Sequence, residues 1–199
     1  MNDLALTEKI HRNFCQFLAK VCGVEVGPET SPETLRMMIC QIELAMESAL
    51  KNGEFLDTVD KYALSHRFAK GMYIREIFIP AGHLVVGRIH RDEHYNVITK
   101  GAVSVLTEAD GLQYLEGPVS MISPAGCKRV VFTHEDTWWT VVHATKLTDL
   151  AAIEEEVIAP SYTALGWQDP KIELQNSAVL QLCNTGELFG KDVLWSGQR

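Results

Sequence analysis

Long apolar runs, paired cysteines and an excess of basic charge are all missing from this sequence of 199 residues. No stretch of about 18 apolar residues occurs, so no segment resembles a transmembrane helix. The first residues, Met1 to Leu4, lack the basic-then-apolar pattern of a secretory signal. We therefore expect a cytoplasmic protein that has no membrane partner.

The cysteine count and the charge balance exclude further classes. The five cysteines are odd in number and form no C-x-x-C pair, so neither a disulfide framework nor a cysteine-based zinc site is expected. Acidic residues outnumber basic ones by 26 to 18, which argues against broad nucleic-acid binding but leaves room for a local basic pocket. Apolar residues make up 46% of the chain, enough for a folded core.

The N-terminal third has helical signals. Thr7 is a candidate cap for a first helix. Ser31-Pro32-Glu33 predicts a second helix, because a hydroxyl cap is followed by proline in the first turn, and Lys51-Asn52-Gly53 predicts its end. We expect residues 1–66 to form a helical N-terminal arm.

The hydrophobic period changes to two between Tyr73 and Ala144. About eight short β-rich runs alternate there with turn residues such as Ala109-Asp110-Gly111, a pattern typical of an antiparallel barrel or jelly roll. We assign the barrel to residues 67–147. Residues 148–199 are expected to form a short helix capped by Thr148 and an extension with a strand at 179–182, packing on the barrel or on a partner.

Two histidines lie close together in the segment His90-Arg91-Asp92-Glu93-His94. On a helix this would be the H-x-x-E-H pattern of a zinc protease. The flanking residues are β-formers with interspersed glycines, which favours a strand, a turn and a second strand. On one straight strand the two histidines would be about 13 Å apart, so the turn at 91–93 is needed to bring them to one metal.

This segment resembles the first motif of the cupin superfamily, G-x5-H-x-H-x3,4-E-x6-G. The matching positions include His90, on the second histidine, and His94, on the glutamate, whereas Arg88 replaces the first histidine. A second cupin motif is similar to the stretch from Gly117 to Thr133, where Arg129 stands in place of its histidine. The resemblance implies a mainly β fold, the cupin double-stranded β-helix or jelly-roll barrel, here with a helical N-terminal arm and a short C-terminal helix.

Three segments are also similar to small cupins encoded in phage and prophage genomes: 87–96, 124–129 and 135–143. This resemblance implies a phage protein that works in the host cytoplasm. Cupins commonly pair through barrel edges, so we expect a homodimer or a larger homo-oligomer.

The resemblance also implies a divalent transition metal, which could be Zn, Fe, Mn, Ni or Cu. Because two of the usual ligand positions are arginines, which cannot bind a cation, another ligand is needed. His143 lies on one face of the strand expected at 137–144 and is the best candidate. We predict that His90, His94 and His143 bind the metal and leave positions open for a ligand.

Arg88 and Arg129 are expected to point into the barrel, where a guanidinium needs an anionic partner. That partner is either an internal carboxylate, Glu76 or Glu93, or a small anionic molecule held by bidentate hydrogen bonds.

Other side chains are assigned supporting roles. Tyr73 and Trp139, with Trp138, are expected to wall the cavity, and Glu93 is the candidate acid or base. Two further histidines, His83 and His134, are predicted in turns, with His134 facing solvent. No partner is evident for His11 or His66.

The resemblance, together with these residues, implies a metal-binding cupin that holds a small anionic molecule, with or without turnover. The alternative is a non-catalytic binding or structural protein that forms oligomers through its helical arm.

Overall fold

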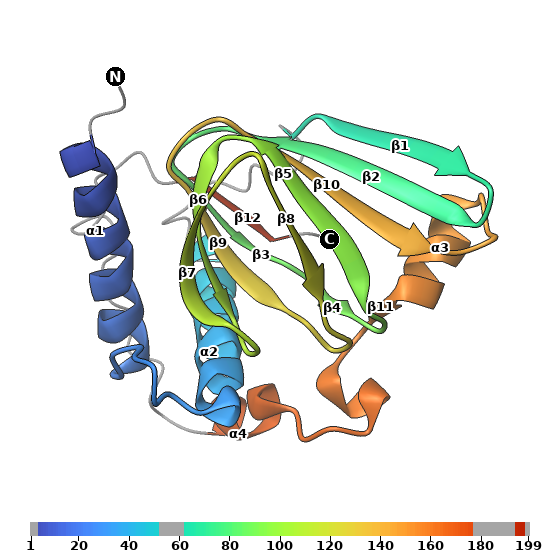
Figure 1. Ribbon diagram of the computed structural model, residues 1–199. Coiled ribbons are helices and arrows are strands. Elements are labelled where there is room, and N and C mark those ends of the chain that lie inside the picture. Colours follow the sequence, from blue (N-terminus) through green and yellow to red (C-terminus); the bar gives the residue numbers. More distant parts are fainter. Residues whose placement is uncertain (1–3, 52–61, 177–193, 198–199) are drawn as a thin grey trace.

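The computed structural model describes residues 4–51, 62–176 and 194–197. Two helices, α1 and α2, precede a run of antiparallel strands, and shorter elements follow it (Figure 1). Their bounds are α1 Leu4–Cys22, α2 Pro32–Lys51, β1 Leu64–Ala69, β2 Met72–Ile79, β3 His83–Val86, β4 Ile89–His90, β5 His94–Lys100, β6 Ala102–Thr107, β7 Gly111–Glu116, β8 Val119–Ser123, β9 Arg129–Thr133, β10 Thr137–Ala144, α3 Leu150–Val157, β11 Ile158–Ala159, η2 Tyr162–Leu165, α4 Pro170–Asn176 and β12 Leu194–Gly197.

The strands form two five-stranded sheets that face each other. The first sheet has the order β1-β2-β10-β5-β8 and the second β12-β3-β9-β6-β7. Without the edge strands β1 and β12, each sheet keeps four strands, and their order is that of a jelly roll. Strands that follow one another along the chain mostly lie in opposite sheets. This confirms the predicted mainly β jelly-roll fold. Within the described residues the sheets are separate and β4 pairs only with β11, so the hydrogen-bonded closure of a barrel is not found.

The interior between the sheets is apolar along most of its length. Alternate residues of each strand point inward, as their period of two requires. On β2 the inward face carries Ile77 and Ile79, which pack against residues of the second sheet such as Val103 and Val131. The same face continues to Arg75 and Tyr73, so the polar site described below lies at one end of this apolar interior.

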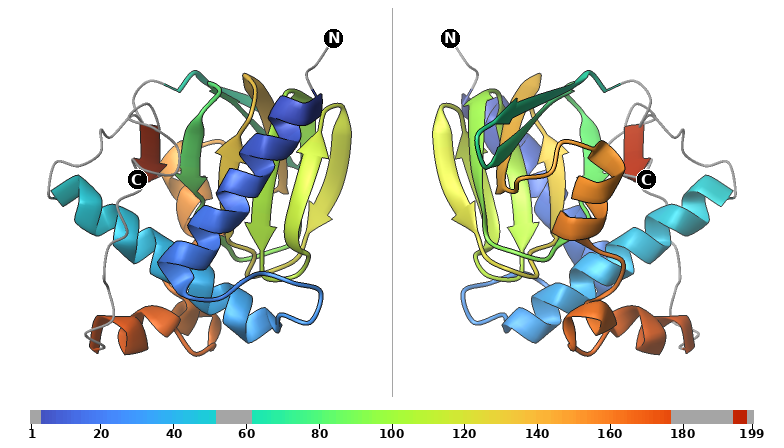
Figure 2. Two further views of the ribbon diagram at one scale, coloured as in Figure 1. Left: turned by 90° about the vertical axis from the view of Figure 1, so that its left-hand side faces the viewer. Right: turned by 90° about the vertical axis from the view of Figure 1, so that its right-hand side faces the viewer.

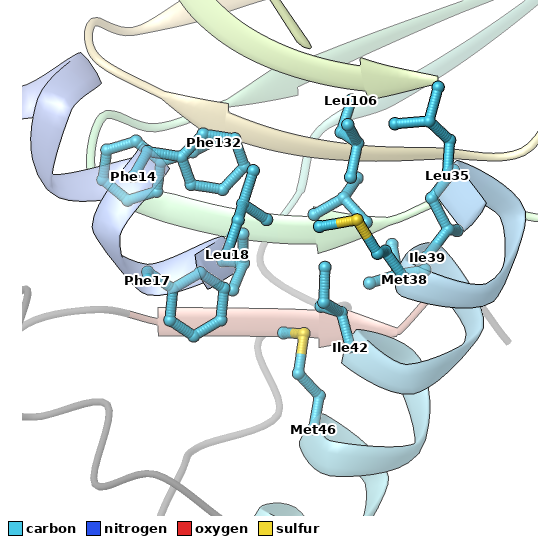
Figure 3. Packing of buried hydrophobic residues seen from close by; sticks show 13 residues of the cluster. Phe14, Phe17, Leu18, Leu35, Met38, Ile39, Ile42, Met46, Leu106 and Phe132 are labelled. Atoms are coloured by element: carbon cyan, nitrogen blue, oxygen red, sulfur yellow. The ribbon is translucent and has the colours of Figure 1, made fainter. Parts of the chain in front are cut away.

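Helices α1 and α2 cover the outer face of the second sheet (Figures 1 and 2). Phe14 of α1 and Ile39 of α2 are fully buried against strand residues that include Phe132 (Figure 3). Strands β3, β6 and β9 are therefore buried on both faces, which explains their unbroken runs of buried residues. The two helices predicted as an arm therefore pack on the second sheet and share a hydrophobic cluster with it.

The helix signals are confirmed in part. The Thr34 amide donates to the Ser31 hydroxyl (3.2 Å), so Ser31 caps α2 as predicted. For α3 the predicted cap, Thr148, is wrong by one residue: the Asp149 carboxylate accepts from the Ala152 amide (2.9 Å), and an ionised acceptor is the stronger cap. None of the described helices is long and apolar enough to cross a membrane.

The ends of the β region differ from the expected limits. Strand β1 begins at Leu64, before the expected start of the barrel at 67, and β12 adds a parallel strand beside β3 from beyond the expected end at 147. The strand expected at 179–182 lies outside the described residues. The domain limits 1–66, 67–147 and 148–199 stay predictions.

Candidate metal and anion site

The turn between β4 and β5 reverses the chain between the two neighbouring histidines. His90 ends β4 and His94 begins β5. Strand β4 is tied to the 126–127 loop, since the Gly126 amide donates to the His90 carbonyl (2.7 Å) and the His90 amide donates to the Cys127 carbonyl (3.0 Å). The strand-turn-strand interpretation is confirmed, and the helical zinc-protease pattern is excluded.

His143 of β10 completes a cluster of three imidazoles. The ring centroids of His90 and His94 are 4.1 Å apart, and His143 lies 5.1 Å and 4.9 Å from them. One nitrogen from each ring can be chosen so that all three lie within 4.8 Å of one another. The structure therefore brings together the three histidines that the sequence predicted as metal ligands.

Burial keeps all three imidazoles neutral. Desolvation is the main cause that lowers the pKa of His94 and of His143 to about 4, and nearby arginines lower both further. The pKa of His90 is lowered most, again chiefly by desolvation and then by its neighbours His94 and Arg129. A neutral imidazole has the free lone pair that a metal requires.

One ring nitrogen is left without a partner. His90 Nδ1 is buried and makes no hydrogen bond within the described part of the chain. An orphaned buried nitrogen is costly, and a bound cation would satisfy it. The three neutral nitrogens form a donor set that suits a divalent transition metal.

Arg129 lies deep beside the cluster, as predicted, but without a carboxylate. It donates to the Asn96 carbonyl oxygen (3.0 Å), to the Ser123 hydroxyl (2.8 Å) and to His94 Nε2 (3.1 Å). Its guanidinium lies 5.2 Å from the centre of the Trp139 ring. The expected pairing with Glu76 or Glu93 is wrong for this arginine, because neutral acceptors surround it.

Arg88 has an internal carboxylate partner that comes from an unexpected element. It forms an ion pair with Glu154 of α3, so the expectation of Glu76 or Glu93 is wrong here too. Glu76 instead contacts Arg67 and Thr140. The sequence could not show that α3 folds back over this end of the sheets.

Arg75 is a third arginine at the site and was missed by the sequence analysis. It lies on the inward face of β2 between Tyr73 and Ile77, and burial lowers its pKa. The signal was the period of two on this strand, which puts residue 75 on the same face as the buried residues 73 and 77. Its charge is one of the causes that lower the pKa of His90 and His143.

A pocket of about 220 Å³ opens beside the histidines. Its polar wall is built from Tyr73, Arg75, Arg88, His90 and His143, and α3 contributes an apolar wall with Leu150, Ile153 and Val157. A smaller cavity of about 60 Å³ continues between the sheets to Arg129 and Trp139. A larger pocket of about 530 Å³ shares Arg88, Glu154 and Ile158 with the first.

Of the other side chains predicted at the site, some line the cavity and others do not. Tyr73 is buried, stacks on His143 and shares a hydrogen bond with His66 Nδ1 (2.8 Å), so His66 does have a partner. Trp138 is exposed and packs on Phe78, so its predicted place in the cavity wall is wrong. Glu93 is exposed in the β4–β5 turn and lines none of the three pockets described above.

Two histidines predicted in turns are in fact covered. His83 is buried at the start of β3 and shares a hydrogen bond with the Tyr62 hydroxyl (2.8 Å). His134 is half-buried under α1 and shares the Ser104 hydroxyl with His11, at 2.7 Å and 2.6 Å. The prediction that His134 faces solvent is wrong because α1 covers this part of the sheet.

This arrangement predicts that stability falls on acidification. Burial lowers the pKa of His134 to about 4, from the ordinary histidine value of 6.5. The unfolded state therefore binds more protons between pH 6.5 and 4, and stability is lost as the pH falls through that window. We expect this partly solvated ring to account for a loss of about 1 kcal/mol in the free energy of unfolding between pH 7.5 and pH 5, measured by urea unfolding. His134→Gln should reduce the pH dependence by about this amount, and the buried histidines of the cluster account for the rest; an unchanged slope in that variant would contradict the assignment.

Comparisons with known proteins found no matching family model and no matching curated protein. Among solved structures, a cupin family protein from Methanocaldococcus jannaschii has a TM-score of 0.38 and 15% identity over 46% of this chain and 87% of its own. A cupin superfamily protein from Desulfitobacterium hafniense has a TM-score of 0.38 and 10% identity, over 42% of this chain and 77% of its own. Ectoine synthase from P. lautus has a TM-score of 0.40 and 11% identity, over 48% of this chain and 72% of its own.

The resemblance to phage-encoded cupins has no support from these comparisons and stays a prediction, as does a homo-oligomer. The chain has the eight-stranded jelly roll that cupins also adopt, with three histidines gathered at one end of its interior.

Proposed function

We propose that the protein binds one divalent transition metal through His90, His94 and His143 and holds a small carboxylate or phosphate beside it. The observation that carries this proposal is the meeting of three neutral imidazoles with the side chains of Arg75, Arg88 and Arg129. When bound, the metal would supply Lewis acidity that polarises an oxygen of the ligand or activates water or O2.

The arginines explain why an anion belongs to the proposal. A divalent cation placed among guanidinium groups is repelled unless negative charge enters with it. Arg75 and Arg88 line the 220 Å³ pocket next to His90 and His143, where an oxyanion would reach both the arginines and the metal. The apolar wall from α3 suits a ligand with a short apolar part.

Binding of the two ligands should therefore be cooperative. We expect phosphate to tighten Zn²⁺ binding by about fivefold or more, a typical coupling between linked sites. The measurement is a Zn²⁺ titration in the presence and absence of phosphate, with chloride at equal ionic strength as the control. Equal Zn²⁺ affinities in phosphate and chloride would contradict the shared site.

Catalysis would need a group that transfers a proton as well. Glu93 was predicted for this role, but its exposed side chain lies in none of the described pockets. The Tyr73 hydroxyl lines the 220 Å³ pocket and is hydrogen-bonded to His66, so we assign the role to Tyr73 in an enzymatic version of the proposal. Turnover of a small acid by the metal-loaded protein separates this version from simple binding.

Glu154 should compete with the anion, because its carboxylate already pairs with Arg88 at the pocket. We expect Glu154→Gln to tighten phosphate binding about threefold to fivefold, since a partly exposed ion pair is worth about 1 kcal/mol at most. Glu155→Gln is the matched control: it removes the same charge from the next residue of α3, which does not line the 220 Å³ pocket. Equal effects of the two variants, measured by calorimetry, would show a general charge effect instead.

A further inference from the structure

The tautomer of His94 is fixed by its own turn. His94 Nδ1 lies 3.1 Å from the backbone carbonyl oxygen of Asp92. A carbonyl oxygen only accepts hydrogen bonds, so Nδ1 carries the proton. Nε2 faces an N–H donor of Arg129 at 3.1 Å, so the ring is neutral and Nε2 is the nitrogen with the lone pair. A metal at His94 would have to bind Nε2.

That lone pair is already in use. Arg129 Nη2 lies 3.1 Å from His94 Nε2, and a guanidinium can only donate. One lone pair cannot accept this hydrogen bond and bind a metal ion at the same time. The positive charge of Arg129 also repels a cation at this position.

Arg129 is held firmly where it is. Its two terminal nitrogens also donate to Asn96 and Ser123, and the indole of Trp139 donates to the same Asn96 oxygen (3.0 Å). Arg129 as a whole residue is only 9% exposed. The contact with His94 is therefore part of a buried network, and it is not a chance approach of a surface arginine.

We propose that Arg129 is an internal competitor of the metal at His94. In the metal-free protein its guanidinium occupies Nε2, and it must leave this nitrogen before His94 can act as a ligand. The inference rests on the proposed function and adds a residue that sets metal affinity below what three free histidines would give.

The test is Zn²⁺ affinity measured by competition with a chromophoric chelator. We expect Arg129→Met and Arg129→Gln to tighten Zn²⁺ binding by about tenfold or more, the equivalent of one charged hydrogen bond that no longer has to break. Arg91→Met is the charge-matched control: Arg91 lies in the turn between the two histidines, but its side-chain hydrogen bond goes to the Ile158 carbonyl. It should change the affinity less than twofold.

A spectroscopic measurement separates this role from a structural one. In the metal-free protein, the imidazole ¹⁵N signal of His94 Nε2 should shift when Arg129 is replaced by glutamine, while the proton stays on Nδ1. Circular dichroism of the methionine and glutamine variants identifies those that fold, and either variant is sufficient for the test.

The outcomes are distinct. Zn²⁺ binding by the unaltered protein that is unchanged or weaker in the folded Arg129 variants overturns the inference and leaves the proposed function intact. Zn²⁺ binding only in the Arg129 variants supports the inference in its strongest form. Absence of Zn²⁺ binding in every protein, the unaltered one included, overturns both.

Discussion

Replacing His90 with alanine is expected to lower Zn²⁺ affinity by at least about 100-fold. Loss of an outer-shell partner already costs 10- to 100-fold at metal sites, and His90 is proposed as a direct ligand. Its Nδ1 has no hydrogen-bond partner in the described part of the chain, so the substitution breaks no protein contact at that atom. The folded state should therefore survive, and the loss should appear in a chelator competition titration.

His66→Ala provides the matched control. His66 lines the same pocket, yet its Nδ1 is hydrogen-bonded to the Tyr73 hydroxyl and it is not one of the three clustered histidines. We expect less than a threefold change in Zn²⁺ affinity. If the His90 and His66 variants bind Zn²⁺ as well as the unaltered protein, the metal is not held by this cluster.

Phe14→Ala is expected to lower the free energy of unfolding by about 3–5 kcal/mol, the usual cost of removing a buried phenylalanine. Phe14 is completely buried, and its ring stacks on Phe17 and Phe132 with centroid distances of 6.2 Å and 5.9 Å (Figure 3). Because Phe132 belongs to β9, the deleted ring would leave a cavity between α1 and the second sheet. Urea unfolding followed by circular dichroism measures the effect.

This experiment distinguishes a helical layer of the core from an arm that serves an oligomer. Met37→Ala, at an exposed position of α2, is the control and should change stability by less than about 0.5 kcal/mol. A loss below 1 kcal/mol for Phe14→Ala, together with a changed mass by light scattering, would show instead that α1 packs on another molecule.

The fold could be predicted from local patterns. Short runs of period two between turn residues are sufficient to indicate a jelly roll, and the polar turn at 91–93 explains how two histidines four residues apart converge. The resemblance to the cupin motif called for a further ligand, and the face of a single strand pointed to His143, which does lie beside the other two histidines. The fold and this convergence could be predicted because each depends on neighbours in the sequence, whereas metal binding stays a prediction.

Contacts between segments that are far apart in the sequence could not be predicted from local patterns. The partner of Arg88 is Glu154, 66 residues away on a helix whose docking leaves no local signature. His134 was misplaced for the same reason, since its cover comes from α1. The role of Arg129 toward His94 depends on two strands and a loop meeting, although the residue itself was predicted to point inward.

The most direct test of the central claim is an anomalous difference map from crystals grown with Zn²⁺. We expect one strong peak at about 2.0–2.1 Å from a nitrogen of each of His90, His94 and His143, with the Arg129 guanidinium moved away from His94 Nε2. A map without a peak among these rings, with Arg129 still donating to His94, would contradict it.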